Sequence, residues 1–242
     1  MLRVCEKITS TFCDLFARIL RHKRFTIFQY YSPFYSSTTN KNPHKISQPI
    51  LSQTLNNKKI LRQKMIKERQ DLSLDKVEEK SRLICAQIEN QEKFQKAKNI
   101  LFYYAKDNEV NLNTLMVKTL AKKEKNVFLP RLERDKEISV RSYNIGDKLQ
   151  TSFYDIKEPL ASSQTFKKED VDLVILPCVA SNKECFRLGF GMGCYDRFLE
   201  NFKGKSIIAS FYFQITEIPK ESHDQKADFV ITESMIYSKK NK

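Results

Sequence analysis

The hydrophobic positions of this chain follow two different periods, and each period predicts its own kind of element. Apolar residues recur at helical spacing in residues 57–71, and the basic residues of that stretch occupy another face of the same helix. The apolar face consists of Leu61, Met65 and Leu72, and the basic face of Lys58, Arg62 and Arg69. A second helix opens at a cap on Ser73 or Asp75, and a third spans residues 111–123.

Short apolar runs between and after these helices are typical of strands. The predicted strands cover residues 99–105, 126–130, 137–143, 172–177, 206–212 and 228–232. Strands that alternate with helices favour a three-layer α/β/α sandwich with a mostly parallel central sheet. In such sheets, ligands gather beyond the carboxyl ends of the strands. We therefore expect a site after the strand at 172–177.

Length and charge narrow the class of protein. The chain has 242 residues, enough for one domain with a sizeable core, and its 40% hydrophobic content is typical of a soluble globular protein. No apolar run approaches the roughly 18 to 20 residues that a transmembrane helix needs. The formal net charge of +14 favours an anionic partner: nucleic acid, a membrane surface or a polyanionic small substrate.

Part of that charge lies in residues 1–50. The first 45 residues carry eight Lys or Arg against two acidic residues, and without them the net charge falls to +8. Apolar residues at helical spacing in 12–20 and a hydroxyl-rich stretch at 30–43 complete the pattern of a mitochondrial transit peptide. The alternative is a disordered basic tail on a cytoplasmic protein. Residues 51–238 are then expected to form a single domain, which is itself basic and suited to anions.

The six cysteines form no CxxC pair and no spacing typical of a secreted, disulfide-rich domain. A zinc site built from Cys178, Cys185, Cys194 and His223 would lack the close ligand pairs of structural zinc, and we do not expect one. Reduced thiols in an intracellular protein fit the pattern better.

Candidate chemistry concentrates in RLGFGMGCYDRFL, residues 187–199, which holds three of the chain's five glycines. Alternate glycines permit positive φ angles and let main-chain N–H groups approach an anion. The helix predicted after them adds its N-terminal amides. Arg187 can pair with a phosphate, and Asp196 can hold Mg²⁺ through a carboxylate oxygen. From spacing alone, a phosphate cradle and a plain structural turn fit about equally well.

This stretch resembles the RLGxGxGYYDRxL signature of the 5-formyltetrahydrofolate cyclo-ligase (methenyltetrahydrofolate synthetase) family. Five further motifs resemble that family in the same order: KKILRQKMIKER, FYYAKDNEVNLNTL, VFLPRL, YDIKEP and KADFVIT. The resemblance implies ATP- and Mg²⁺-dependent closure of 5-formyltetrahydrofolate to 5,10-methenyltetrahydrofolate, with release of ADP and phosphate. In that scheme the formyl oxygen is phosphorylated, nitrogen 10 attacks the activated carbon, and phosphate leaves.

The resemblance also implies roles for particular residues. Lys58 and Arg62 match residues that contact the triphosphate, and a solvated basic face is their alternative. The implied nucleotide loop consists of Arg187, Leu188, Gly189, Phe190, Gly191, Met192, Gly193, Cys194 and Tyr195. Arg187 and Asp196 are implied as catalytic residues. Asp196 and Asp228 are implied as magnesium ligands, although Asp228 also fits a turn at the start of a strand.

The folate site that the resemblance implies is centred on Glu109. Tyr103 and Tyr104 are candidate walls for the pterin, although both also fit ordinary strand core. Arg131 is expected to reach the same cleft, with a structural ion pair as its alternative, and Cys194 to line the folate. We expect a monomer that binds reduced folate and ATP, and neither nucleic acid nor a membrane.

Several positions depart from the family pattern. Cys185 replaces a glycine and is strained if that glycine needs a positive φ. Asp155 replaces the glycine of the GI-x-EP motif, Met192 stands where Gly or Lys is usual, and Cys194 replaces an aromatic residue. A catalytically weak relative that only binds folate or nucleotide therefore stays an alternative. The positive net charge also leaves RNA binding as an alternative function, but the sequence has no recognised nucleic-acid motif.

Overall fold

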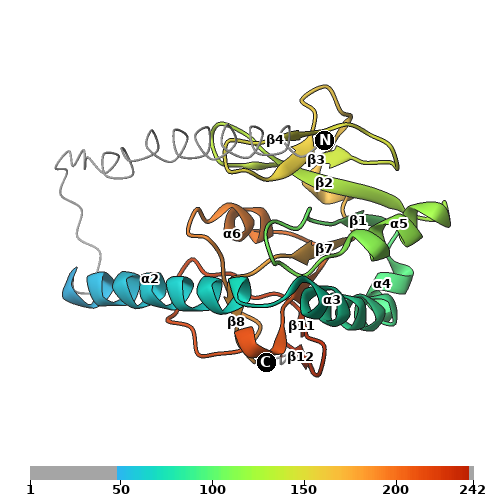
Figure 1. The fold of residues 1–242 in the computed structure, drawn as a ribbon. Coiled ribbons are helices and arrows are strands. Elements are labelled where there is room, and N and C mark those ends of the chain that lie inside the picture. Colours follow the sequence, from blue (N-terminus) through green and yellow to red (C-terminus); the bar gives the residue numbers. More distant parts are fainter. Residues whose placement is uncertain (1–47, 240–242) are drawn as a thin grey trace, which may run out of the picture. The chain divides into compact units, whose positions relative to one another are not determined.

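The computed structural model describes residues 48–239, and an eight-stranded sheet forms the centre of this part of the chain (Figure 1). The strand order is β12-β11-β10-β7-β1-β2-β3-β6. These strands are β1 Asn99–Leu101, β2 Asn126–Leu132, β3 Ile138–Ser142, β6 Thr165–Phe166, β7 Leu173–Leu176, β10 Lys205–Ala209, β11 Phe229–Ile231 and β12 Ile236–Ser238. Two ribbons lie outside the sheet: β4 Leu149–Thr151 with β5 Lys157–Pro159, and β8 Ala180–Ser181 with β9 Arg187–Leu188.

The five central strands, β11, β10, β7, β1 and β2, are parallel, and antiparallel strands close both edges. Parallel neighbours need crossover connections. Helix α5 (Asn113–Ala121) lies in the crossover from β1 to β2, and α6 (Cys194–Leu199) in the one from β7 to β10. The prediction of a mostly parallel sheet is confirmed.

Helices cover both faces of this sheet. Successive side chains of a strand point to opposite faces, and the neighbours Ile100 and Leu101 in β1 accordingly belong to different apolar clusters. The cluster of Ile100 includes residues of α3 (Leu74–Glu89), α4 (Glu92–Lys96) and α5. The cluster of Leu101 includes Phe198 and Leu199 of α6. The three-layer α/β/α architecture predicted from the sequence is confirmed.

The first described helix, α2 (Gln48–Gln70), begins before residue 57 and runs across the boundary expected at residue 50. Its Met65 is buried in a third apolar cluster with residues of the β8–β9 ribbon. Met65 lies on the same helix face as Lys58 and Arg69, which are also buried. The prediction that the basic and apolar faces of this helix are separate is therefore wrong for Met65. No helix within residues 48–239 combines the length and the apolar character needed to cross a membrane.

Three strands end two or more residues from the predicted position. The strand expected over 99–105 ends at Leu101, the strand expected to end at Pro130 continues to Leu132, and the strand expected over 206–212 ends at Ala209. Pro130 is tolerated because β1 pairs with β2 only as far as Phe128, so Pro130 has no neighbour on that side to which it would donate.

Candidate active site

The glycine stretch forms a loop between β9 and α6. Gly191 has a φ of +105° and Gly193 one of +67°, which favour glycine, whereas Gly189 has no positive φ and open space where a Cβ would lie. Among the described residues, none accepts a hydrogen bond from the main-chain N–H of Phe190, Gly191 or Met192. The loop therefore offers the main-chain donors that a phosphate cradle requires.

Arg62 of α2 lies against this loop. Its Nε donates to the carbonyl oxygen of Gly189 at 2.8 Å, and its guanidinium carbon lies 3.5 Å from the position of a Cβ on Gly191. Burial lowers the pKa of Arg62, while the carboxylates of Glu221 and Asp224 oppose that shift. A cation beside unpaired main-chain donors suits an anionic ligand.

Lys58, one turn before Arg62, is buried rather than solvated. Its Nζ lies 2.5 Å from Oε2 of Glu221 and 2.8 Å from Oδ2 of Asp224, and only 3% of the residue is exposed. The alternative of a solvated basic face is therefore wrong for Lys58. The sequence prediction did not include Glu221 or Asp224, although the polar stretch ESHD, residues 221–224, in the segment before the last parallel strand was a signal for them.

Arg187 and Asp196, the two predicted catalytic residues, are in contact. Nη2 of Arg187 lies 3.3 Å from Oδ1 of Asp196, and its guanidinium carbon lies 5.6 Å from the ring centroid of Tyr195. The same Oδ1 accepts the main-chain N–H of Gln225 at 3.3 Å, which joins α6 to the segment of Asp224. Arg187 is buried, and its Nη1 has no hydrogen-bond partner within the described part of the chain. Such an unpaired buried donor costs about 1–3 kcal/mol and is often explained by a functional role.

Glu109 lies in the loop after β1 and is buried. Its Oε1 is 3.5 Å from Nη1 of Arg69, and its Oε2 accepts the main-chain N–H of Lys106 at 3.0 Å. Burial raises the pKa of Glu109, and the charge of Arg69 opposes this shift. Burial also raises the pKa of Tyr195, on which the charges of Glu109 and Arg187 act in opposite directions. Tyr195 is therefore within electrostatic range of both Glu109 and Arg187.

The other expected folate residues have structural contacts. The hydroxyl of Tyr103 donates to the carbonyl of Val110 at 2.7 Å, and Tyr104 packs against the larger core. Nη1 of Arg131 pairs with Oε1 of Glu158 at 2.8 Å, which is the structural ion pair that was its alternative. Nε of Arg131 is buried without a hydrogen-bond partner among the described residues, and it lies 3.8 Å from Oε1 of Glu133.

The remaining loop residues lie at the edges of this arrangement. Leu188 is buried in the cluster beneath α2, where it anchors the loop. The carbonyl of Met192 accepts from Nη1 of Arg197 at 3.0 Å, and Sγ of Cys194 lies 3.7 Å from Nη2 of the same arginine. Cys194 therefore faces Arg197, and no contact joins it to Glu109 within residues 48–239.

Asp228 belongs to a different network from Asp196. Its Oδ2 accepts from the main-chain N and the hydroxyl of Ser206, each at 3.0 Å, and its Oδ1 lies 3.4 Å from Nζ of Lys205. These contacts tie the beginnings of β10 and β11 together, the role of a strand-initial turn residue. The expected pairing of Asp228 with Asp196 is not observed, whereas Asp224, four residues earlier, lies beside Lys58.

Metal-ligating side chains gather at one place in residues 48–239. Ligand atoms of Glu221, His223 and Asp224 lie within 4.8 Å of one another, and no cysteine belongs to such a group in this part of the chain. The four described cysteines are free and buried. Burial raises the pKa of the Cys178 and Cys185 thiols to about 11. A carboxylate-rich group suits Mg²⁺ better than a thiolate site would.

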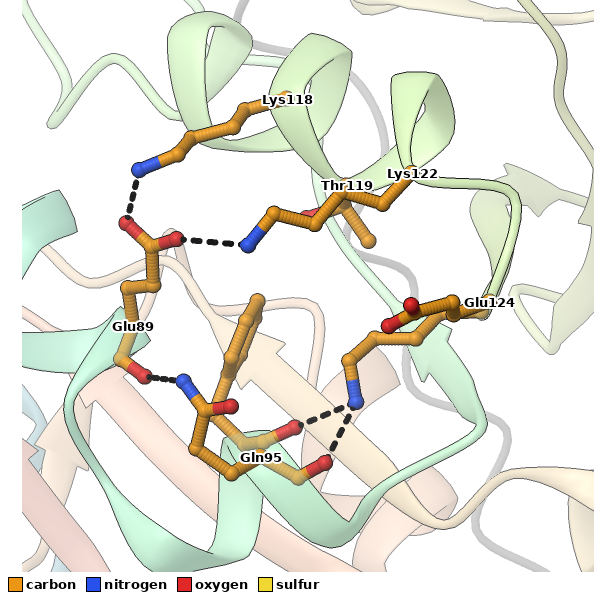
Figure 2. A pocket seen from close by; sticks show the side chains of 8 residues that line it. Glu89, Gln95, Lys118, Thr119, Lys122 and Glu124 are labelled. Carbon is orange, nitrogen blue, oxygen red and sulfur yellow. Dashed lines mark hydrogen bonds and ion pairs between the residues drawn. The ribbon is translucent and has the colours of Figure 1, made fainter.

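A separate pocket lies between α3, α4 and α5. Figure 2 shows Glu89 between Lys118 and Lys122, which it pairs with at 2.7 and 3.4 Å. The cavity of about 60 Å³ is far below the roughly 300–1,000 Å³ of ligand sites. None of the candidate site residues lines it. The pocket is therefore too small for a folate or a nucleotide.

Sequence comparison relates this chain to one family. The model of the 5-formyltetrahydrofolate cyclo-ligase family matches residues 54–233. The 5-formyltetrahydrofolate cyclo-ligase of Haemophilus influenzae is 32% identical over 135 residues, which cover 53% of this chain and 72% of that protein. The mouse protein of the same name is 27% identical over 198 residues, or 73% of this chain and 93% of its own length.

Solved structures agree with the sequence comparison. The 5,10-methenyltetrahydrofolate synthetase of Aquifex aeolicus has a TM-score of 0.68 and 31% identity, and covers 76% of this chain and 94% of its own. The synthetase of Mycoplasma pneumoniae, with a TM-score of 0.61 and 23% identity, covers 73% of this chain and 99% of its own and supports the fold alone. The chain therefore belongs to the 5-formyltetrahydrofolate cyclo-ligase family.

Proposed function

We propose that this protein converts 5-formyltetrahydrofolate to 5,10-methenyltetrahydrofolate in a reaction that consumes ATP, requires Mg²⁺, and releases ADP and phosphate. Membership of the family supports the substrate and the product. The observation that carries the proposal is that the buried Arg187 flanks the glycine loop with its unpaired N–H groups, and that Arg69 contacts both Phe190 of this loop and the buried Glu109.

ATP would lie with its phosphates against the glycine loop. The unpaired N–H groups of Phe190, Gly191 and Met192 and the side chain of Arg62 supply donors along one side. Nη1 of Arg187 supplies a buried donor that has no hydrogen-bond partner among the described residues. Fixed donors of this kind stabilise charge that develops on a transferred phosphoryl group, and positioning supplies most of the remaining catalysis.

Mg²⁺ fits the carboxylates at the edge of this loop. Asp224 and Glu221 offer oxygen ligands beside Lys58, and Asp196 is joined to their segment through Gln225. Carboxylate oxygens are the ligands that Mg²⁺ prefers. Both oxygens of Asp228 already contact Ser206 and Lys205, so we assign the metal to Asp196 and Asp224 instead. When bound, the ion would neutralise phosphate oxygens of the nucleotide.

The folate would place its formyl group between the loop and Glu109. The formyl oxygen attacks the γ-phosphorus and ADP leaves, after which nitrogen 10 attacks the activated carbon and phosphate leaves with the oxygen. No side chain is needed as a nucleophile, so the contribution of the protein is alignment of the reactants. The Glu109 carboxylate can accept hydrogen bonds from N–H groups of the reduced folate.

The purified protein should form product only when 5-formyltetrahydrofolate, ATP and Mg²⁺ are all present, as followed by the absorbance of 5,10-methenyltetrahydrofolate. Gly189→Ala is a sharp probe of the nucleotide site, because the added methyl group has open space in the ligand-free protein. We expect this variant to keep the melting temperature of the wild type and to raise the KM for ATP. An unchanged KM for ATP would show that the nucleotide does not bind against the glycine loop. Binding of both substrates without product formation would favour the non-catalytic relative instead.

A further inference from the structure

Arg69, at the carboxyl end of α2, touches three segments that are distant in sequence. Its Nη1 lies 3.5 Å from Oε1 of Glu109 and donates to the carbonyl of Cys178, after β7, at 3.3 Å. Its guanidinium carbon lies 5.9 Å from the ring centroid of Phe190, in the glycine loop. One buried cation therefore contacts both the acid expected at the folate and the loop expected at the nucleotide.

The loop of Glu109 is attached to the end of α2 by a second contact. Nδ2 of Asn108 donates to the carbonyls of Arg69 and Leu72 at 3.1 and 3.0 Å. The main chain is thus already anchored without the guanidinium of Arg69. The side chain of Arg69 is only 2% exposed, and its Nε has no hydrogen-bond partner among the described residues. A purely structural arginine would be expected to use all its buried donors, because each unpaired one is costly.

The charge of Arg69 opposes the rise that burial causes in the pKa of Glu109. The titratable and charged groups that face the carboxylate are Arg69, Lys106, Asp107, Tyr103, Cys178 and Tyr195. Of these, the charge of Lys106 opposes the effect of burial on the pKa of Glu109 less than the charge of Arg69 does, and Asp107 acts in the same direction as burial. Without Arg69, the buried carboxyl group would be held in its neutral form over a wider pH range.

We propose that Arg69 is a positioning residue, which holds the Glu109 carboxylate for the folate and holds the glycine loop for the nucleotide through Phe190. The proposal rests on the proposed function for the identity of the two substrates. It implies that one side chain links the two half-sites, so that substitutions of Arg69 affect both substrates.

Kinetics of Arg69→Met, Arg69→Lys and Phe190→Leu separate the two contacts. In Arg69→Met, the KM for the folate should rise about tenfold, and the acid limb of the pH profile of kcat/KM should move up by about one pH unit. Arg69→Lys should keep that limb near its wild-type position, because the positive charge remains. Phe190→Leu should raise the KM for ATP and leave the acid limb in place. The exposed Arg82 of α3 provides a matched control, and Arg82→Met should change none of these quantities.

A stability cycle tests the same link without turnover. Because the pKa of Glu109 is raised in the folded protein, the free energy of unfolding decreases as pH rises from about 4 through the folded-state pKa. Arg69→Met raises that pKa further, so its loss of stability relative to the wild type should grow with pH. In a Glu109→Gln background, the loss caused by Arg69→Met should be independent of pH.

A pH-independent loss in both backgrounds would overturn the proposal, as would an unchanged acid limb in Arg69→Met. If the wild type forms no product, the proposed function fails, and the stability cycle still decides whether Arg69 controls Glu109. If Arg69→Met does not fold, the comparison of Arg69→Lys with Arg69→Gln replaces it: an acid limb that moves only in Arg69→Gln supports the proposal, and equal limbs overturn it.

Discussion

The ammonium of Lys58 lies 2.8 Å from a carboxylate oxygen of Asp224, and the two residues are 166 positions apart in the chain. Glu221 completes the arrangement at 2.5 Å, and the side chains of all three residues are largely buried. Lys58 thus pairs with Asp224, one of the two carboxylates to which we assign Mg²⁺, and with the neighbouring Glu221. The lysine and the metal ion should therefore compete for the oxygens of Asp224.

Replacement of Lys58 by Met tests this competition. The two carboxylates lose their counter-charge, and a broken buried pair costs about 3–5 kcal/mol. We expect the melting temperature of Lys58→Met to be lower than that of the wild type. Millimolar Mg²⁺ should raise the melting temperature of the variant much more than that of the wild type, as measured by thermal unfolding with Mg²⁺ or with EDTA. Lys59→Met, at an exposed neighbour, is the control and should respond like the wild type. If Lys58→Met is destabilised and its melting temperature does not change with Mg²⁺, the metal does not bind at this site.

Removal of the Arg187 side chain should impair catalysis more than folding. Its guanidinium carries a buried donor without a partner, so Arg187→Ala removes a contact that we expect to form only with the reacting phosphate. The expected loss is about 3 kcal/mol of transition-state stabilisation, or roughly 100-fold to 1,000-fold in kcat. Arg187→Lys, which keeps a charge but loses the fork of donors, should recover part of it. Near-native turnover of Arg187→Ala would show that Arg187 does not contribute to catalysis.

Cys185 adopts a φ of +68°, which confirms the strain expected for a residue at a family glycine position. A left-handed conformation costs about 1–2 kcal/mol for residues with a Cβ. We therefore expect Cys185→Gly to be more stable than Cys185→Ala by about 1 kcal/mol, as measured by chemical denaturation. At Ala209 in β10, where φ is not positive, Ala209→Gly should instead be destabilising. Equal stabilities of the two Cys185 variants would contradict the strain.

The targeting prediction concerns residues 1–50, of which residues 1–47 lie outside the described residues. We propose that residues 1–45, fused to a fluorescent reporter, direct it to mitochondria, because they combine apolar residues at helical spacing with an excess of positive charge. Arg18→Glu with Arg21→Glu should abolish import. A reporter that stays diffuse in the cytosol would contradict the targeting proposal and favour the alternative of a basic tail. A chain that begins at Gln48 keeps α2 whole and should keep full activity.

The layered fold could be predicted because its central strands are apolar on both faces. The run at Leu173–Leu176 is fully buried, and a run of that kind is typical of a parallel strand between helical layers. The ribbon strands Ala180–Ser181 and Arg187–Leu188 could not be predicted, because two residues are too few to establish a period. Their pairing depends on a turn at Cys185 and on α2, neither of which leaves a local signal.

Sequence could predict the site residues that belong to one motif. It could not predict those that are brought together by contacts between distant segments. Arg187 and Asp196 lie in one signature, and the structure brings them into contact. Asp224 and Asp228 are both acidic and only four residues apart, so sequence alone does not tell which of them turns toward Lys58. The burial of Lys58 likewise depends on carboxylates from the far end of the chain.

Helix α2 carries Lys58, Arg62 and Arg69, yet it packs on the smallest of the three apolar clusters. Local opening of a protein begins with the elements that bury the least apolar surface. The amides of α2 should therefore exchange with solvent hydrogen sooner than those of β7 in the ligand-free enzyme. A bound nucleotide would slow this exchange, because it binds the docked helix and not the released one. The lifetime of the protein against proteases should then depend on how much nucleotide surrounds it.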